Sequence, residues 1–134
     1  MKLLPGFLTF KLSPVPKGRP RVRVNGRFPQ IYTPKTTAEF ETEIAFQTRK
    51  QWKDQMLEQF DDDVRLSVEI TLACYKKTGD VDNMAKAILD GIVKAECVMH
   101  DDVAVDHLVV SRSFVKKGNE SIRVVIRPVG TVTP

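Results

Sequence analysis

Four aspartates and one lysine in the second half of the chain have the types and spacing that suit metal-dependent hydrolysis. Asp80 and Asp82 stand at the predicted junction between a strand and a helix, and Lys86 follows Asp82 by one helical turn. Asp101 and Asp102 stand at the entrance to a later predicted strand. If the two strands are neighbours, all four carboxylates converge at one end of the sheet. Oxygen ligands of this kind suit Mg²⁺, which prefers about six oxygens at roughly 2.0–2.1 Å.

The segment that holds these residues is acidic in an otherwise basic chain. From Asp80 to Asp106 it carries seven acids and two lysines, a net charge of −5. Carboxylates that crowd together repel one another unless a positive group lies among them. The charge pattern therefore favours a bound cation.

Each of these residues also has a purely structural explanation. Asp80 or Asp82 could cap the helix, since aspartate is a good N-cap residue. Asp82 and Lys86 could form a routine ion pair between residues four apart, worth only a few tenths of a kcal/mol. Asp101 and Asp102 could be loop acids. Taken together, these explanations leave the clustering of the acids without a reason.

The cysteines and histidines do not form a zinc motif. Cys74 and Cys97 lie 23 positions apart with no CxxC pair, so each is interpreted as a structural thiol. His100 and His107 are seven apart with no cysteine partner nearby, so both are interpreted as surface or packing groups.

Two other acidic patterns are not interpreted as metal motifs. A calcium EF-hand beginning at Asp80 fails, because Ala85 stands where the loop needs glycine and Gly91 stands where it needs glutamate. The run Asp61–Asp63 is interpreted as a solvated loop between a helix and a strand.

Basic residues concentrate near the start of the chain. The formal net charge is +4, yet residues 1–38 hold eight Lys or Arg and no acid, and the remainder is net −4. Such a segment indicates a polyanion partner. The residues expected to contact it are Arg19, Arg21, Arg23, Arg27, Lys35, Lys76 and Lys77.

The first third of the chain predicts a strand, a hairpin and a helix. Residues 7–12 form a short strand, and Asn25-Gly26 predicts a projecting hairpin over about residues 21–28. Phe28 or Tyr32 could stack on unpaired bases, but a hydrophobic anchor for the hairpin is favoured. Thr36 and Glu39 form a capping box that opens the first helix. Its predicted apolar stripe consists of Phe40, Ile44, Trp52, Met56 and Phe60, ahead of Asp61.

The rest of the chain predicts a strand, a helix and two further strands. Alternation from Leu66 to Cys74 indicates a strand with one buried face. A helix follows to about Lys94, with Val81, Met84, Ile88 and Ile92 on one face and Asp82, Asn83, Lys86 and Asp90 on the other. Strands at about residues 103–115 and 122–126 complete the chain.

This order predicts a single compact α/β (α+β) domain over residues 1–134, with a mixed β-sheet and two main helices. One domain is what 134 residues normally form. No stretch approaches the roughly 20 apolar residues of a membrane span, and the start of the chain does not read as a secretory signal. We therefore expect a cytoplasmic protein with no membrane partner.

One long motif resembles a known family. The segment Gly79–Gly91, followed after nine residues by Asp101-Asp102, resembles the signature of the RusA family of Holliday-junction resolvases. The family pattern is Asp-x-Asp-Asn, a lysine four residues after the second Asp, a further Asp one turn along, and a downstream Asp-Asp. Lys17–Arg21 and Tyr32–Lys35 also resemble family members, so the likeness extends over about residues 17–127.

The resemblance implies a homodimeric, Mg²⁺-dependent endonuclease that makes paired nicks in four-way DNA junctions during recombination and repair. It implies Mn²⁺ as a substitute metal and no small-molecule cofactor. The catalytic residues that match are Asp80, Asp82, Lys86 and Asp102, and Asp101 joins the three acids as a metal ligand. Asp90 matches a supporting position. The expected setting is the bacterial nucleoid or a phage-infected cell, and a prophage origin is compatible.

The chemistry supports this interpretation in its own right. Hydrolysis of a phosphodiester needs a nucleophilic water and a stabilised leaving oxygen, and a carboxylate-bound metal supplies both. Lys86 could offset charge on the phosphate or hold Asp82 in its ligating rotamer. Two alternatives stay open: a broader nuclease acting on flaps, forks or RNA, and a non-catalytic module that binds DNA junctions.

Overall fold

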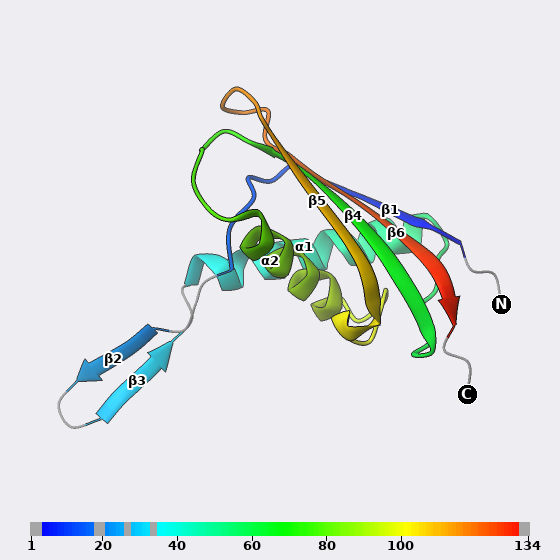
Figure 1. Ribbon diagram of the computed structural model, residues 1–134, viewed down its shortest axis with the longest axis horizontal. Helices are drawn as coiled ribbons and strands as arrows, with labels where there is room; N and C mark the ends of the chain where they lie inside the picture. Colours follow the sequence, from blue (N-terminus) through cyan, green and yellow to red (C-terminus); the bar gives the residue numbers. More distant parts are fainter. Residues whose placement is uncertain (1–3, 18–20, 26–27, 33–34, 132–134) are drawn as a thin grey trace.

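The computed structural model describes residues 4–17, 21–25, 28–32 and 35–131. Figure 1 shows the chain as two helices beside a four-stranded sheet, with a separate two-stranded ribbon. The elements in chain order are β1 (Gly6–Phe10), β2 (Arg21–Asn25), β3 (Phe28–Tyr32), α1 (Lys35–Asp54), β4 (Val64–Cys74), α2 (Val81–Lys94), the short 3-10 helix η1 (Asp102–Ala104), β5 (Val105–Phe114) and β6 (Ser121–Thr131).

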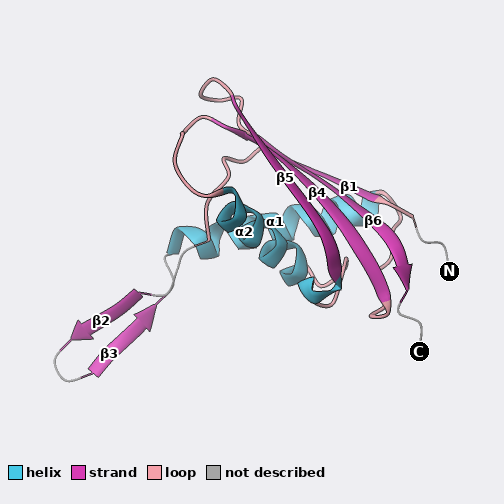
Figure 2. Cartoon of the chain, in the orientation of Figure 1, coloured by secondary structure: helices cyan, strands magenta, loops and turns pink. Residues whose placement is uncertain are grey.

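The four-stranded sheet has the order β1-β6-β4-β5. β6 is antiparallel to both of its neighbours, whereas β4 and β5 are parallel. Parallel strands need a crossover connection, and here α2 supplies it. Both helices lie on one face of the sheet (Figure 2). The prediction of an α+β fold with a mixed sheet and two main helices is therefore confirmed. Within the described residues, neither helix combines the length and apolarity needed to cross a membrane.

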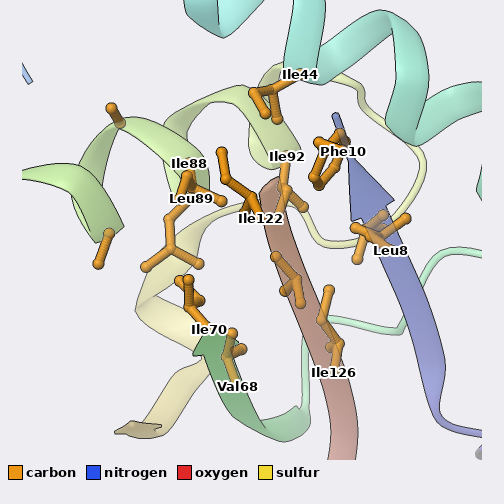
Figure 3. Packing of buried hydrophobic residues seen from close by; sticks show 14 of the residues in the cluster. Leu8, Phe10, Ile44, Val68, Ile70, Ile88, Leu89, Ile92, Ile122 and Ile126 are labelled. Carbon is orange, nitrogen blue, oxygen red and sulfur yellow. The ribbon is translucent and has the colours of Figure 1, made fainter. Parts of the chain in front are cut away.

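The hydrophobic core lies between the helices and the inner face of the sheet (Figure 3). β4 buries alternate residues along its whole length, as its sequence alternation predicts. On α2, Met84, Ile88 and Ile92 are buried, and the opposite side of the helix carries Asp82 and Lys86 in solvent. The predicted amphipathic helix is therefore confirmed, and its polar side is free to do chemistry.

The predicted limits of the first helix are wrong at both ends. α1 begins at Lys35, which places Thr36 inside the first turn rather than at the cap. It ends at Asp54, and Met56 adopts φ 57° and is 89% exposed. Phe60 is buried, but it reaches Trp52 from the following loop, in an edge-to-face contact with ring centroids 6.0 Å apart. Tertiary packing of this loop, not helical periodicity, places Phe60 in the core.

Gln51 of α1 and Gln55, directly after the end of this helix, bond the outer edge of β1. Gln51 accepts from the backbone N–H of Thr9 at 2.8 Å and donates to its carbonyl at 2.7 Å. Gln55 does the same with Phe7, at 2.9 and 2.7 Å. The exposed polar backbone of an edge strand is a template for unwanted pairing. These side chains satisfy that backbone from within the chain.

The predicted hairpin is confirmed as an antiparallel pair, β2 and β3, which Figure 1 shows apart from the main sheet. Asn25 is the last residue of β2 and pairs with Phe28. Asn25 therefore belongs to the strand rather than to the centre of the turn. The turn itself, at residues 26–27, lies outside the described residues.

Gly91 lets the two helices approach closely. It is buried, and a Cβ at this position would lie 2.7 Å from Cβ and Cγ2 of Ile44 and 3.1 Å from the carbonyl oxygen of Glu41. The two distances to Ile44 are too short for a real side-chain contact, so the backbone of α2 packs directly on α1.

We expect Gly91→Ala to lower the free energy of unfolding by about 1–3 kcal/mol, because overpacking forces backbone shifts. In an exposed helix the same change would stabilise by up to about 1 kcal/mol, so the sign of the effect is informative. Urea unfolding followed by circular dichroism measures it. The exposed control Lys53→Ala should change stability by less than about 0.5 kcal/mol. A Gly91→Ala variant as stable as the parent would contradict this description of the interface.

Candidate active site

The start of α2 presents two carboxylates without a structural partner among the described residues. Asp80 is the N-cap residue, with φ −87° and ψ 137°, yet its side chain makes no capping hydrogen bond. Its backbone carbonyl accepts from the N–H of Met84 at 3.1 Å. Asp82 is exposed in the first turn, and no ion pair to it is formed within the described part of the chain. The positive end of the helix dipole stabilises both charges at this point.

Lys86 does not pair with Asp82. Its Nζ lies 2.8 Å from Oδ2 of Asp102 and 3.0 Å from Oδ1 of Asp90. The hydrogen bonds to Asp102 and then to Asp90 raise the pKa of Lys86, and they outweigh the opposing effect of burial. The routine ion pair between Asp82 and Lys86 is thus not formed. Lys86 is instead a permanent positive charge that links α2 to η1.

A second lysine continues this network on the other side of Asp90. The Nζ of Lys17 lies 2.9 Å from Oδ2 of Asp90 and 3.0 Å from Oε2 of Glu41 on α1. Burial by itself lowers the pKa of Lys17, but the hydrogen bonds to Asp90 and Glu41 outweigh it and raise that pKa. Five charged groups of alternating sign therefore run from α1 to η1. In order they are Glu41, Lys17, Asp90, Lys86 and Asp102.

The expectation that the aspartates meet at one end of the sheet is wrong, because β4 and β5 are parallel. Leu66 pairs with Val105 and Cys74 pairs with Phe114, so the end of β4 and the start of β5 lie at opposite ends of the sheet. α2 runs back between these ends. Asp102 therefore reaches Lys86 because α2 runs back along the sheet, and not because the two strand ends meet.

Asp101 lies beside this contact as the N-cap of η1. Its Oδ1 accepts from the N–H of Val103 at 3.4 Å, and the residue is exposed. Hydrogen bonding with Asp102, followed by the bond from Val103, lowers the pKa of Asp101. Its carboxylate is therefore ionised at neutral pH.

The donor chemistry of the predicted ligands fits a hard cation, because Asp80, Asp82, Asp101 and Asp102 offer only carboxylate oxygens. The described residues contain no group of three or more His, Cys, Asp or Glu side chains arranged to hold a metal ion. The structure brings Asp102 to Lys86 and leaves Asp80 and Asp82 at the start of the same helix. Metal binding by these acids stays a prediction.

Comparison with known proteins places the chain in a family. The sequence model of a family described as endodeoxyribonuclease RusA matches residues 11–127. The chain belongs to the RusA family of endodeoxyribonucleases. It is also 28% identical to the crossover junction endodeoxyribonuclease RusA of Aquifex aeolicus (strain VF5) over 116 residues, which cover 86% of this chain and 85% of that protein. The recognition made from the motif is confirmed, and the chain is a nuclease.

Two arginines that sequence reasoning missed hold the RusA-family motif in place. Arg65 of β4 bonds Oδ2 of Asp106 at 2.9 Å and the carbonyl of Val103 at 2.6 Å, which fastens η1 to the sheet. The same guanidinium lowers the pKa of Asp106. Arg112 of β5 donates to the carbonyl of Gly79 at 2.7 Å, directly before Asp80. Neither contact has a sequence signal, because both join residues that are more than 30 positions apart.

The predicted DNA-binding residues fall in three places. Arg21 and Arg23 are residues of β2 and Lys35 opens α1, but the side chains of these three residues lie outside the description. Lys76 and Lys77 are exposed in the loop that leads to α2, and Lys76 lines a hollow of about 270 Å³ together with Gly79. The remaining two, Arg19 and Arg27, lie outside the described residues.

Proposed function

We propose that this RusA-family chain is a structure-selective endonuclease that resolves four-way DNA junctions by paired phosphodiester hydrolysis, in recombination and repair. One observation carries the proposal. Lys86 lies on α2, the helix that begins with Asp80 and Asp82, and its ammonium group is shared between Asp90 of the same helix and Asp102 of η1. The printed name of the Aquifex aeolicus relative supports a crossover junction as substrate. Family membership argues against a non-catalytic module.

Asp80, Asp82 and Asp102 are the residues that would hold Mg²⁺ or Mn²⁺, with Asp101 as a further ligand. When bound, such a cation supplies a nucleophilic water and stabilises the leaving oxygen. The two acids at the start of α2 suit this role because neither is used by a cap or an ion pair among the described residues. No small-molecule cofactor is part of the proposal.

Lys86 would act on the phosphate itself. An ammonium group has three N–H donors, and Asp90 and Asp102 take two of them. Because the side chain is 51% exposed, the third donor can reach a phosphate oxygen. A fixed positive charge aimed at the phosphoryl oxygens lowers the barrier as negative charge develops there.

We expect the purified protein to nick a synthetic four-way junction symmetrically in Mg²⁺, and to lose this activity in a chelator. Asp82→Asn should reduce cleavage by at least about 10²-fold while junction binding survives, because a carboxylate ligand is lost but the basic surface is kept. Gel analysis of labelled junctions, with fork and duplex DNA alongside, measures rate and substrate class together.

The control for this experiment is Asp63→Asn, which removes an exposed loop acid and should cleave at the parent rate. Normal cleavage by Asp82→Asn would overturn the assignment of the metal ligands. Equal cleavage of forks and junctions would favour the alternative of a broader branched-DNA nuclease.

Phosphate contacts are assigned to basic residues of the segment 19–35 and of the loop before α2. These are Arg19, Arg21, Arg23, Arg27, Lys35, Lys76 and Lys77. Residues 1–38 hold eight basic groups and no acid, so DNA bound beside the acidic site has positive charge next to it. Contacts to phosphate position DNA without reading its sequence.

We expect junction affinity in a chelator to fall steeply with salt. If each subunit of the dimer neutralises four or five phosphates, log K should change by about −8 per decade of salt. The double variant Arg21→Gln, Arg23→Gln should make this slope shallower by about 4, because two ion contacts are lost in each subunit. Fluorescence anisotropy measures it, with Lys50→Gln on α1 as the control. Binding that is independent of salt would contradict this assignment.

The proposal includes a homodimer, because two active sites are needed to cut opposed strands of a two-fold symmetric junction. The outer edge of β5 is a candidate contact surface. Within the described residues it has no strand beside it and no hydrogen bond like those that Gln51 and Gln55 give β1. Leu108 and Val109 of this strand are exposed, as is Phe114 at its end.

We expect the protein to run as a dimer in light scattering and Leu108→Asp to shift it towards the monomer, because a buried, unpaired charge is costly at an interface. The monomer should leave nicked junctions in place of paired products. Met56→Asp, at an exposed loop position, is the control and should stay dimeric. A Leu108→Asp variant that remains fully dimeric would place the interface elsewhere.

A further inference from the structure

Lys17 lies outside the segment from Asp80 to Asp102 that carries the predicted chemistry, yet ion pairs connect it to that segment. Its ammonium bridges Glu41 of α1 and Asp90 of α2 at 3.0 and 2.9 Å, and Asp90 in turn holds Lys86 at 3.0 Å. We infer that Lys17 is a positioning residue for Lys86, acting through Asp90; the inference rests on the proposed function. In this inference, Lys17 controls how strongly the ammonium group of Lys86 binds Asp90 relative to Asp102.

The backbone around Lys17 is fixed at the same place. Its N–H donates to the carbonyl of Asn83 at 2.9 Å, in the first turn of α2. The preceding carbonyl, of Pro16, accepts from the hydroxyl of Thr37 on α1 at 3.4 Å. The main chain at Pro16 and Lys17 is thus bonded to both helices, to a backbone carbonyl of α2 and to a side-chain hydroxyl of α1, so the side chain of Lys17 has a defined origin. An ammonium held in this way can orient a carboxylate.

The electrostatics explain why Asp90 depends on Lys17. Glu41 and Asp90 both approach the same ammonium, and their side chains are only 14% and 22% exposed. Without Lys17, two carboxylates would face each other with little water to screen them. Asp90 would then turn away from Glu41 and bind Lys86 more strongly. Lys86 would be drawn from Asp102, and the donor meant for phosphate would be misplaced.

A direct DNA contact by Lys17 is the competing explanation, because the residue leads into the basic segment. The geometry favours positioning, since two of the three donors of Lys17 are already bonded to carboxylates and its side chain is only 30% exposed. A DNA contact and a positioning role predict different effects of a substitution at Lys17. A phosphate contact contributes to affinity and to its salt dependence, whereas a positioning residue contributes to the rate of the bound complex.

The test compares Lys17→Gln and Lys17→Arg with the full-length parent. Lys17→Gln should lower the single-turnover rate of junction cleavage by about tenfold, a misplacement effect within the 10²-fold that small displacements can cause. The dissociation constant in chelator should change less than about twofold, with an unchanged salt slope. Lys17→Arg should recover most of the rate, because a guanidinium can also bridge two carboxylates. Lys50→Gln is the matched control and should behave as the parent.

A second measurement needs no cleavage. The side-chain NMR signals of Lys86 should move in Lys17→Gln and return in Lys17→Arg. Glu41→Gln should move them the opposite way, because Asp90 then has Lys17 to itself. This variant also serves if Lys17→Gln proves too unstable, as thermal unfolding will show. A parent protein that does not cut junctions would overturn the proposed function, and the Lys86 signals would still decide this inference.

Parent-like rates in Lys17→Gln with unmoved Lys86 signals would overturn the inference. So would a Lys17→Gln variant that loses affinity and salt dependence but keeps the rate of the bound complex, because that pattern identifies a DNA contact.

Discussion

Repulsion among carboxylates is the constraint on which the rest of this site depends. Seven acids fall between Asp80 and Asp106, and most of them must stay ionised in a folded chain. The structure meets this constraint by interleaving lysines. Lys17 and Lys86 separate Glu41, Asp90 and Asp102, so each carboxylate in the network touches an ammonium. Asp80 and Asp82 are left outside it, at the positive end of the helix dipole of α2.

The crossover helix α2 gives these charged groups fixed positions. α2 buries one side against the sheet and α1, and Gly91 allows the backbones to come close enough for Glu41 and Asp90 to share Lys17. Its other side carries the exposed residues Asp82 and Lys86. A large DNA substrate needs such an open surface, since it cannot enter a closed cavity. One side of α2 thus packs in the core, and the opposite side is accessible to a substrate.

The arginines of the sheet complete the arrangement from outside the motif. Arg65 fixes η1, and Arg112 fixes the loop before Asp80. Both act on backbone carbonyls of the segments that carry the acids. The RusA-family motif is therefore a surface whose geometry depends on residues of β4 and β5 as much as on α2 itself. Position along the chain gives no hint of these residues.

Local patterns in the sequence determined the elements: alternation specified β4, the 3.6-residue period specified α2, and the spacing from Asp80 to Asp102 identified the family. Only the tertiary structure decided the pairings. The apolar stripe predicted for the first helix continued past Asp54, where the observed helix ends, because it included Phe60. Phe60 is buried because the loop after the helix brings it back to Trp52, and not because it lies on the helix. Likewise, the parallel register of β4 and β5 put Asp102 beside Lys86 rather than at the edge that holds Asp80. Periodicity is a property of neighbours in sequence, whereas ion pairs and strand register depend on segments that meet only when the chain folds.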